Sequence, residues 1–113
     1  MIEMLIVAIA ALSLIALSSR ANTRFRREAR LPMQWSFSGG VNWTAPRVLA
    51  LSFTPALATC ILTTAAAAML VSEPRPGQEG LGPPVLMFMA FGFLAAHLLH
   101  LRMIEKALRG GSR

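Results

Sequence analysis

The sequence predicts an all-α integral membrane protein with three transmembrane helices and an interfacial loop between the first two. Just over half of the 113 residues are hydrophobic, and they are concentrated in three blocks without any Asp, Glu, Lys or Arg. The blocks are Met4 to Leu17, Val48 to Val71 and Pro84 to Leu101. A soluble amphipathic helix carries a polar residue on its outer face about once per turn, and barrel strands alternate in polarity. Neither pattern is present, so the blocks are expected to be membrane helices.

The lengths of the blocks set the expected boundaries. At about 1.5 Å per residue, the second block reaches roughly 36 Å and the third roughly 27 Å, against a hydrocarbon core of about 30 Å. We expect the first helix over 2–30, because no breaker precedes Pro32, with its span at about 2–19. A single membrane domain, 1–113, then contains an interfacial loop at 31–46, a span at 47–71, a loop at 72–83, a span at 84–101 continuing to 109, and a tail at 110–113.

The first block has one competing interpretation, a secretory signal peptide. Its length and the small residues Ala16 and Ser18 suit such a peptide. A signal peptide has a basic amino-terminal region, whereas Glu3 is the only charged side chain before this apolar run. A retained membrane helix is therefore favoured.

The charges predict the orientation. The segment that joins the first two spans has a net charge of +5, because it contains one acidic residue, Glu28, and six arginines. The arginines are Arg20, Arg24, Arg26, Arg27, Arg30 and Arg47. The second loop is slightly acidic and the tail is basic. Basic segments favour the cytoplasmic side, which predicts an outside amino terminus and a cytoplasmic carboxyl terminus. We expect the first five arginines to contact anionic lipid headgroups, which compete with any nucleic acid, so no nucleic-acid partner is expected.

The segment 31–46 has the composition of a loop folded onto the membrane surface. Aromatic side chains suit the headgroup level, a Gly-Gly pair suits a turn, and Thr44 with Pro46 suits the start of a helix. At the amino terminus of the second helix, Arg47 opposes the helix dipole, so we expect an anionic group to compensate it. The expected interfacial and docking residues are Pro32, Gln34, Trp35, Phe37, Gly39, Gly40, Asn42, Trp43 and Arg47.

This segment resembles an element of small bacterial membrane proteins of unknown function, which is also found at the amino terminus of Sdp-type toxin-immunity and signalling proteins. In that element, a Pro-x-His-aromatic sequence precedes a Gly, an acidic or amide residue, an aromatic, a basic residue and a membrane helix. The corresponding positions are Pro32, Trp35, Gly39, Asn42, Trp43, Arg47 and the helix beginning at Val48. The resemblance covers about 31–57 and implies a location in the bacterial cytoplasmic (inner) membrane.

Two departures from the element limit what the resemblance implies. Gln34 replaces the usual His, so a role in protonation or metal binding is not carried over. Trp43 is shifted by one residue. In immunity-type relatives the loop is expected outside the cell, whereas the arginines of this chain predict that it lies inside. We adopt the orientation that the arginines predict.

The second span has a row of small residues at helical spacing: Ser52, Ala56, Thr59, Cys60, Thr63 and Ala67. We call this row the small-residue ridge. It suits close helix packing, and we expect it to contact the first or third span rather than another protein. Pro55 removes the donor for the Leu51 carbonyl, for which Ser52 or Thr54 is the expected substitute. Cys60 has no possible disulfide partner and is expected to act as a small packing residue.

His97 and His100 share one face of the third helix because they are three residues apart. Two imidazoles at this spacing suit either hydrogen bonds or a haem, pigment or metal ligand. No Cys, Asp or further His cluster supplies other ligands. Hydrogen bonding is therefore favoured, no cofactor is expected, and the cofactor site is the alternative.

The residues do not predict catalysis, because no nucleophile has a positioned base and no glycine-rich phosphate loop is present. Transport is disfavoured because the spans lack deeply placed ionisable groups. Two functional hypotheses remain. The first is an accessory or structural subunit that packs on other membrane subunits or on its own copies. The second, from the resemblance, is an immunity-type or regulatory protein that recognises a membrane-active peptide or sensor.

Overall fold

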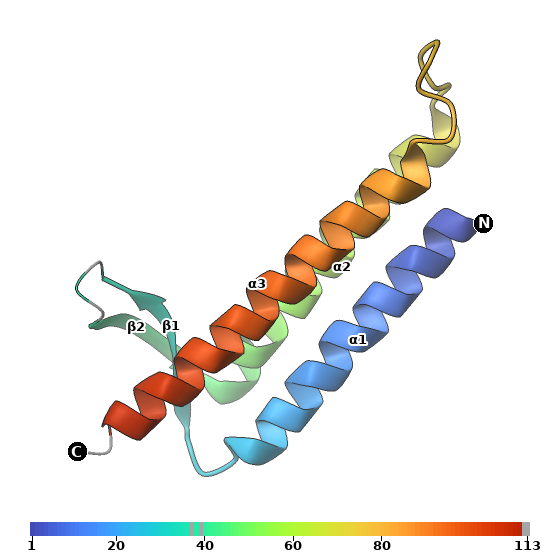
Figure 1. Ribbon diagram of the computed structural model, residues 1–113. Helices are drawn as coiled ribbons and strands as arrows, with labels where there is room; N and C mark the ends of the chain where they lie inside the picture. The colour runs from blue at the N-terminus through green and yellow to red at the C-terminus, as the bar shows by residue number, and fades with distance from the viewer. Residues whose placement is uncertain (37, 39, 112–113) are drawn as a thin grey trace.

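Three helices and one β-hairpin make up the part of the chain that the computed structural model describes, residues 1–36, 38 and 40–111. The elements are α1 (Ile2–Arg24), β1 (Arg30–Trp35), β2 (Val41–Pro46), α2 (Arg47–Val71) and α3 (Gly82–Gly111). The start of α1 and the 72–81 connection lie at one end of the bundle, which we call the loop end (Figure 1). The other end, which carries the strands, is the hairpin end.

All three helices are long and apolar enough to cross a membrane. No more than 28% of the residues in any of their apolar windows are buried within the chain. Large apolar side chains therefore cover the outside, as at Leu12 and Phe88, which are 67% and 80% exposed. This surface is compatible with a membrane location, where lipid covers apolar side chains. The bounds of α2 agree with the predicted span, and α3 extends two residues beyond the predicted 84–109 at each end.

The first helix is shorter than the predicted 2–30. It ends at Arg24, and Phe25 closes it by donating its backbone N–H to the Ala21 carbonyl at 2.8 Å. Phe25 is buried in the core at this end of the bundle. Helix-forming residues after it do not continue the helix because the chain turns there to enter β1, a tertiary constraint that overrides local propensity.

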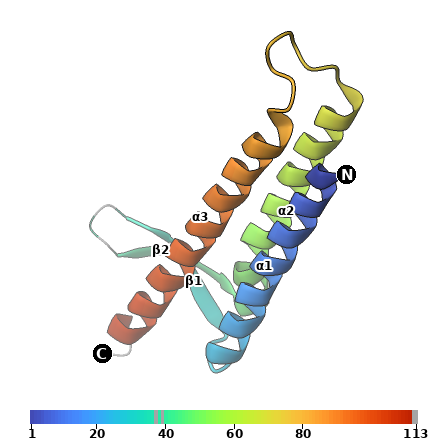
Figure 2. The ribbon, with the colours of Figure 1, turned by 45° about the vertical axis from the view of Figure 1, so that its right-hand side comes forward.

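The prediction of an all-α fold is wrong for segment 31–46, which contains an antiparallel hairpin instead of an irregular loop. Arg30 pairs with Pro46 and Trp35 with Val41, with irregularities on either side of Gln34. Leu31 and Pro32 are buried and Met33 and Trp35 are partly buried, while Arg30 and Gln34 are exposed, so most of this strand is covered. The hairpin extends away from α1 past the carboxyl-terminal half of α3 (Figures 1 and 2). Phe37 and Gly39 lie outside the described residues.

Thr44 does not mark the start of the helix as its residue type suggested, because it belongs to β2, and α2 begins at the predicted bound, Arg47. No side chain caps α2. Instead, the Arg47 backbone N–H donates to the Ala29 carbonyl at 3.0 Å, which joins the first turn of α2 to the segment before β1.

Two apolar clusters hold the helices together. At the hairpin end, all three helices and both strands contribute: Ala21, Phe25, Leu31, Ala45, Ala50, Leu51, Leu101 and Ile104. Toward the loop end, only the helices contribute: Val7, Ala10, Leu62, Ala66, Leu86 and Ala90. The polar groups described next lie where the hairpin-end cluster meets the middle of the bundle.

Candidate functional site

Pro55 creates the polar centre of the bundle. A proline has no backbone N–H, so the Leu51 carbonyl one turn earlier loses its helical donor. A buried carbonyl without a partner costs about 1–3 kcal/mol. Another group has to donate to it, and that group comes from a different helix.

The donor is the Ser18 hydroxyl of α1, 2.6 Å from the Leu51 oxygen. The same hydroxyl oxygen lies 2.8 Å from Nε2 of His97 on α3. A serine has one hydroxyl hydrogen, which it gives to the carbonyl, so its oxygen accepts the Nε2–H of His97. This chain of two hydrogen bonds, which we call the three-helix relay, links α1, α2 and α3 at one level. The expected substitutes, Ser52 and Thr54, do not supply the donor; Ser52 donates to the Val48 carbonyl at 2.6 Å.

His97 is fully buried, and its Nδ1 has no partner among the described residues. Because Nε2 carries the hydrogen, Nδ1 is the acceptor nitrogen of the ring. The ring therefore acts as a hydrogen-bond donor inside the bundle.

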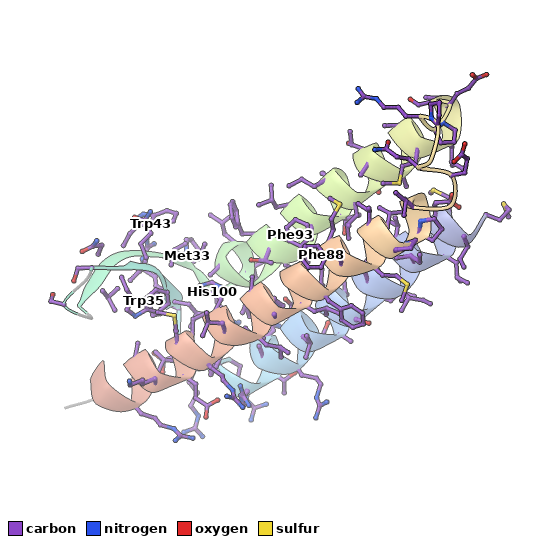
Figure 3. All side chains as sticks on the ribbon, turned by 45° about the horizontal axis from the view of Figure 1, so that its top comes forward. Met33, Trp35, Trp43, Phe88, Phe93 and His100 are labelled. Atoms are coloured by element: carbon purple, nitrogen blue, oxygen red, sulfur yellow. The ribbon has the colours of Figure 1, made fainter. Side chains whose placement is uncertain are left out.

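His100 joins α3 to the hairpin. Its Nε2 lies 3.3 Å from the Pro32 carbonyl of β1 and donates to it. The Trp35 ring meets the imidazole edge-on, with ring centroids 5.7 Å apart. Figure 3 shows Trp35 and His100 together beside α3, with Trp43 on the other side of the hairpin. The two histidines thus have different partners although they share one helix face.

The histidine geometry gives no support to a haem, pigment or metal site. Each Nε2 is engaged with a protein oxygen. Within the described ranges, no three His, Cys, Asp or Glu side chains are grouped so as to hold a metal ion.

The small-residue ridge does not pack inside the chain, so the expectation that it contacts the first or third span is wrong. Only Thr59 is partly buried; Ser52, Ala56, Cys60, Thr63 and Ala67 are exposed. The buried face of α2 is formed instead by Ala50, Leu51, Pro55, Ala58, Leu62 and Ala66. The ridge therefore lies on the outer surface of α2.

Arg47 finds partners other than the expected anionic group. Its Nη1 donates to the carbonyls of Arg26 and Glu28 at 2.7 and 2.8 Å, and its Nε donates to Oδ1 of Asn22 at 2.8 Å. Backbone carbonyls that follow the end of α1 are negative ends of peptide dipoles, so they compensate the guanidinium. Arg47 therefore stabilises the junction of α1, the hairpin and α2.

The arginines expected at lipid headgroups are all exposed at the hairpin end: Arg20, Arg24, Arg26, Arg27 and Arg30. Two of them also have partners in the chain. Arg24 pairs with Glu105 at 3.0 Å, and Arg30 donates to the hydroxyl and carbonyl of Thr44 across the hairpin.

The interfacial residues divide between the two faces of the hairpin. Pro32 and Trp35 are covered by the bundle, whereas Gln34, Asn42 and Trp43 are exposed, Trp43 to 50%. The exposed Gly40 closes the turn by accepting the Ser36 backbone N–H at 2.8 Å.

Comparison of the chain with protein-family models, curated proteins and solved structures finds no match. The resemblance of segment 31–57 to the Sdp-type element therefore stays a prediction.

Sequence reasoning missed Ser18. The signal was available, because an unsatisfied carbonyl before Pro55 and a nearby histidine both require a polar partner in an apolar bundle. Only the packing of α1 against α2 and α3 identifies which hydroxyl supplies it.

The relay predicts that Ser18→Ala lowers the free energy of unfolding in detergent by about 1–3 kcal/mol, because it orphans the Leu51 carbonyl and the His97 Nε2–H. In a Pro55→Ala background, residue 55 regains an N–H for the carbonyl. The cost of Ser18→Ala should then fall by about 0.5 kcal/mol or more.

The control is Ser13→Ala, since the exposed Ser13 hydroxyl donates only to Ile9 of its own helix. It should be nearly neutral in both backgrounds. An equal cost of Ser18→Ala with and without Pro55 would contradict the relay.

Proposed function

We propose that this chain is a non-catalytic integral protein of a bacterial cytoplasmic membrane that acts as an accessory or structural subunit, packing on other membrane subunits or on its own copies. The observation that carries the proposal is the outward position of the small-residue ridge. Other exposed positions on the same helix carry large apolar side chains, such as Leu57 and Ile61. A row of small side chains on an outer face suits a second helix, since it lets the two backbones approach closely.

The relay supports the same role. It fixes the mutual positions of the three helices with buried hydrogen bonds, which are strong in apolar surroundings. A rigid bundle offers its ridge to a partner without a large ordering cost, and preorganisation of this kind favours association.

Ala56→Leu should disrupt the partner contact because the added side chain blocks close helix approach. An overpacked interface loses about 1–3 kcal/mol, or roughly 5- to 150-fold in affinity. Native purification of a tagged chain, with mass spectrometry of the bound proteins and measurement of self-association, provides the readout.

The matched control is Ala95→Leu, an equally conservative change at an exposed position of α3. If both variants retain the same partners and the same oligomeric state as the wild type, the subunit proposal fails.

The charge distribution supports an orientation with the hairpin end in the cytoplasm. Arginines gather there, while Glu3, Glu73 and Glu79 lie toward the loop end. In a Cys60→Ser background, an impermeant maleimide should therefore label Gln78→Cys in intact cells and should leave Arg27→Cys unlabelled until the cells are opened. The reverse pattern would refute the orientation.

An immunity-type or regulatory role is the second candidate, favoured by the exposed Trp43 on the outer face of the hairpin. Trp43 is half exposed while Trp35 packs on His100. Aromatic side chains at exposed positions are frequent anchors for protein partners. In this candidate function, the exposed face of the hairpin recognises a membrane-active peptide or sensor, and the covered face has no part in recognition.

Substitutions of the two tryptophans distinguish a role in recognition from a role in stability. Trp43→Ala should leave thermal unfolding in detergent nearly unchanged, whereas Trp35→Ala should lower the free energy of unfolding by about 1–3 kcal/mol through lost packing. In cells challenged with the peptide or stress, loss of protection by Trp43→Ala supports the second candidate, and full protection removes it.

A further inference from the structure

A groove of about 340 Å³ runs between α1 and α3 at the hairpin end. Arg20 and Arg24 line it from α1, and Arg102 and Glu105 line it from α3. Pockets that take small ligands begin at about this volume. Figure 3 shows nitrogen-tipped side chains gathered along the same end of the bundle.

The groove has an unbalanced positive charge. Its three arginines and one glutamate give a formal charge of +2. Glu105 is already engaged through both oxygens, with Arg24 at 3.0 Å and Arg109 at 2.6 Å. Arg20 and Arg102 have no hydrogen bond or ion pair within the described part of the chain, so two guanidiniums remain available. The planar guanidinium donates two parallel hydrogen bonds, a geometry that matches phosphate.

The groove also has an apolar part, and the order of apolar and cationic residues along the groove indicates the kind of ligand that fits. Leu17 precedes Arg20 on α1, and Leu98 precedes Arg102 on α3; both leucines line the groove. Since α1 and α3 both run toward the hairpin end, the leucines lie nearer the middle of the bundle and the arginines nearer its end. Leu98 is 46% exposed and continues the apolar outer surface. The order from apolar to cationic matches a phospholipid, from acyl chain to phosphate.

We propose that this groove binds one anionic phospholipid, with its phosphate between Arg20 and Arg102 and the start of an acyl chain along Leu17 and Leu98. The net charge selects an anionic lipid, because a zwitterionic lipid adds its own cation to a site that already has excess positive charge. The inference rests on the proposed membrane location and assigns a specific lipid site to two of the headgroup-facing cations.

The test uses the full chain in nanodiscs made of equal parts phosphatidylglycerol and phosphatidylcholine, followed by gentle release and native mass spectrometry of the lipids retained. The wild type should retain phosphatidylglycerol in preference to phosphatidylcholine. R20Q/R102Q should reduce that retention about tenfold more than R26Q/R27Q, because only the first pair loses direct charge-assisted hydrogen bonds. The second pair removes the same charge from exposed arginines that do not line the groove.

Other outcomes overturn the proposal. Equal losses in the two double variants mean attraction to the basic surface as a whole. Displacement of the lipid by an equal concentration of glycerophosphate means a site for soluble phosphate, and release of an acidic protein from native membranes by R20Q/R102Q means a protein site. If R20Q/R102Q unfolds, R20K/R102K keeps the charge without the planar donors and should still bind less lipid than R26K/R27K; equal binding overturns the proposal.

The experiment separates this inference from the proposed membrane location. A wild-type chain that does not enter nanodiscs refutes the location itself. A chain that enters them and retains both lipids equally refutes only the lipid site.

Discussion

Because Pro55 has no backbone N–H, hydrogen bonds between helices satisfy the carbonyl that this N–H would have bound. These bonds connect all three helices. Without that N–H, the Leu51 carbonyl accepts from Ser18, and Ser18 in turn accepts from His97. In an apolar interior, each of these groups is costly to leave unpaired. A local defect in one helix thus becomes a connection among all three, and the level of each helix relative to the others is specified by directional bonds in addition to apolar packing.

The hairpin end is built around similar directional contacts. Arg47 binds carbonyls beyond the end of α1, and His100 binds the Pro32 carbonyl of β1. These contacts are reinforced by the buried Phe25 and Leu31. At the loop end, by contrast, the described core consists of apolar side chains of the helices. Specific geometry is therefore concentrated where the charges and the strands are, and this end carries the candidate sites.

The arginines of the hairpin end have two physical roles. The guanidiniums of Arg47 and Arg30 donate hydrogen bonds to oxygens of the chain itself, so these two arginines have a structural role. Arg20 and Arg102 have no such partner among the described residues and line a groove that Leu17 and Leu98 also line. Positive charge near a membrane surface favours one orientation in either case, but only unpaired guanidiniums are free to bind a phosphate.

The sequence by itself determined three long apolar helices, because uncharged blocks of that length leave no alternative in lipid, and it located α2 at its observed bounds. It also identified Pro55 as the origin of a free carbonyl. Tertiary structure decided the rest. Local propensity favoured a helix through Arg30 and a loop at 31–46, whereas pairing of 30–35 with 41–46 and burial of Phe25 ended the helix and formed strands. The spacing of the small-residue ridge predicts which residues share a helix face but not what that face contacts. In the structure, a different face of α2, which includes Leu51 and Leu62, packs in the interior. Ser18 became a site residue only because α1 brings its hydroxyl to a carbonyl 33 positions away in the chain, a proximity that no local pattern encodes.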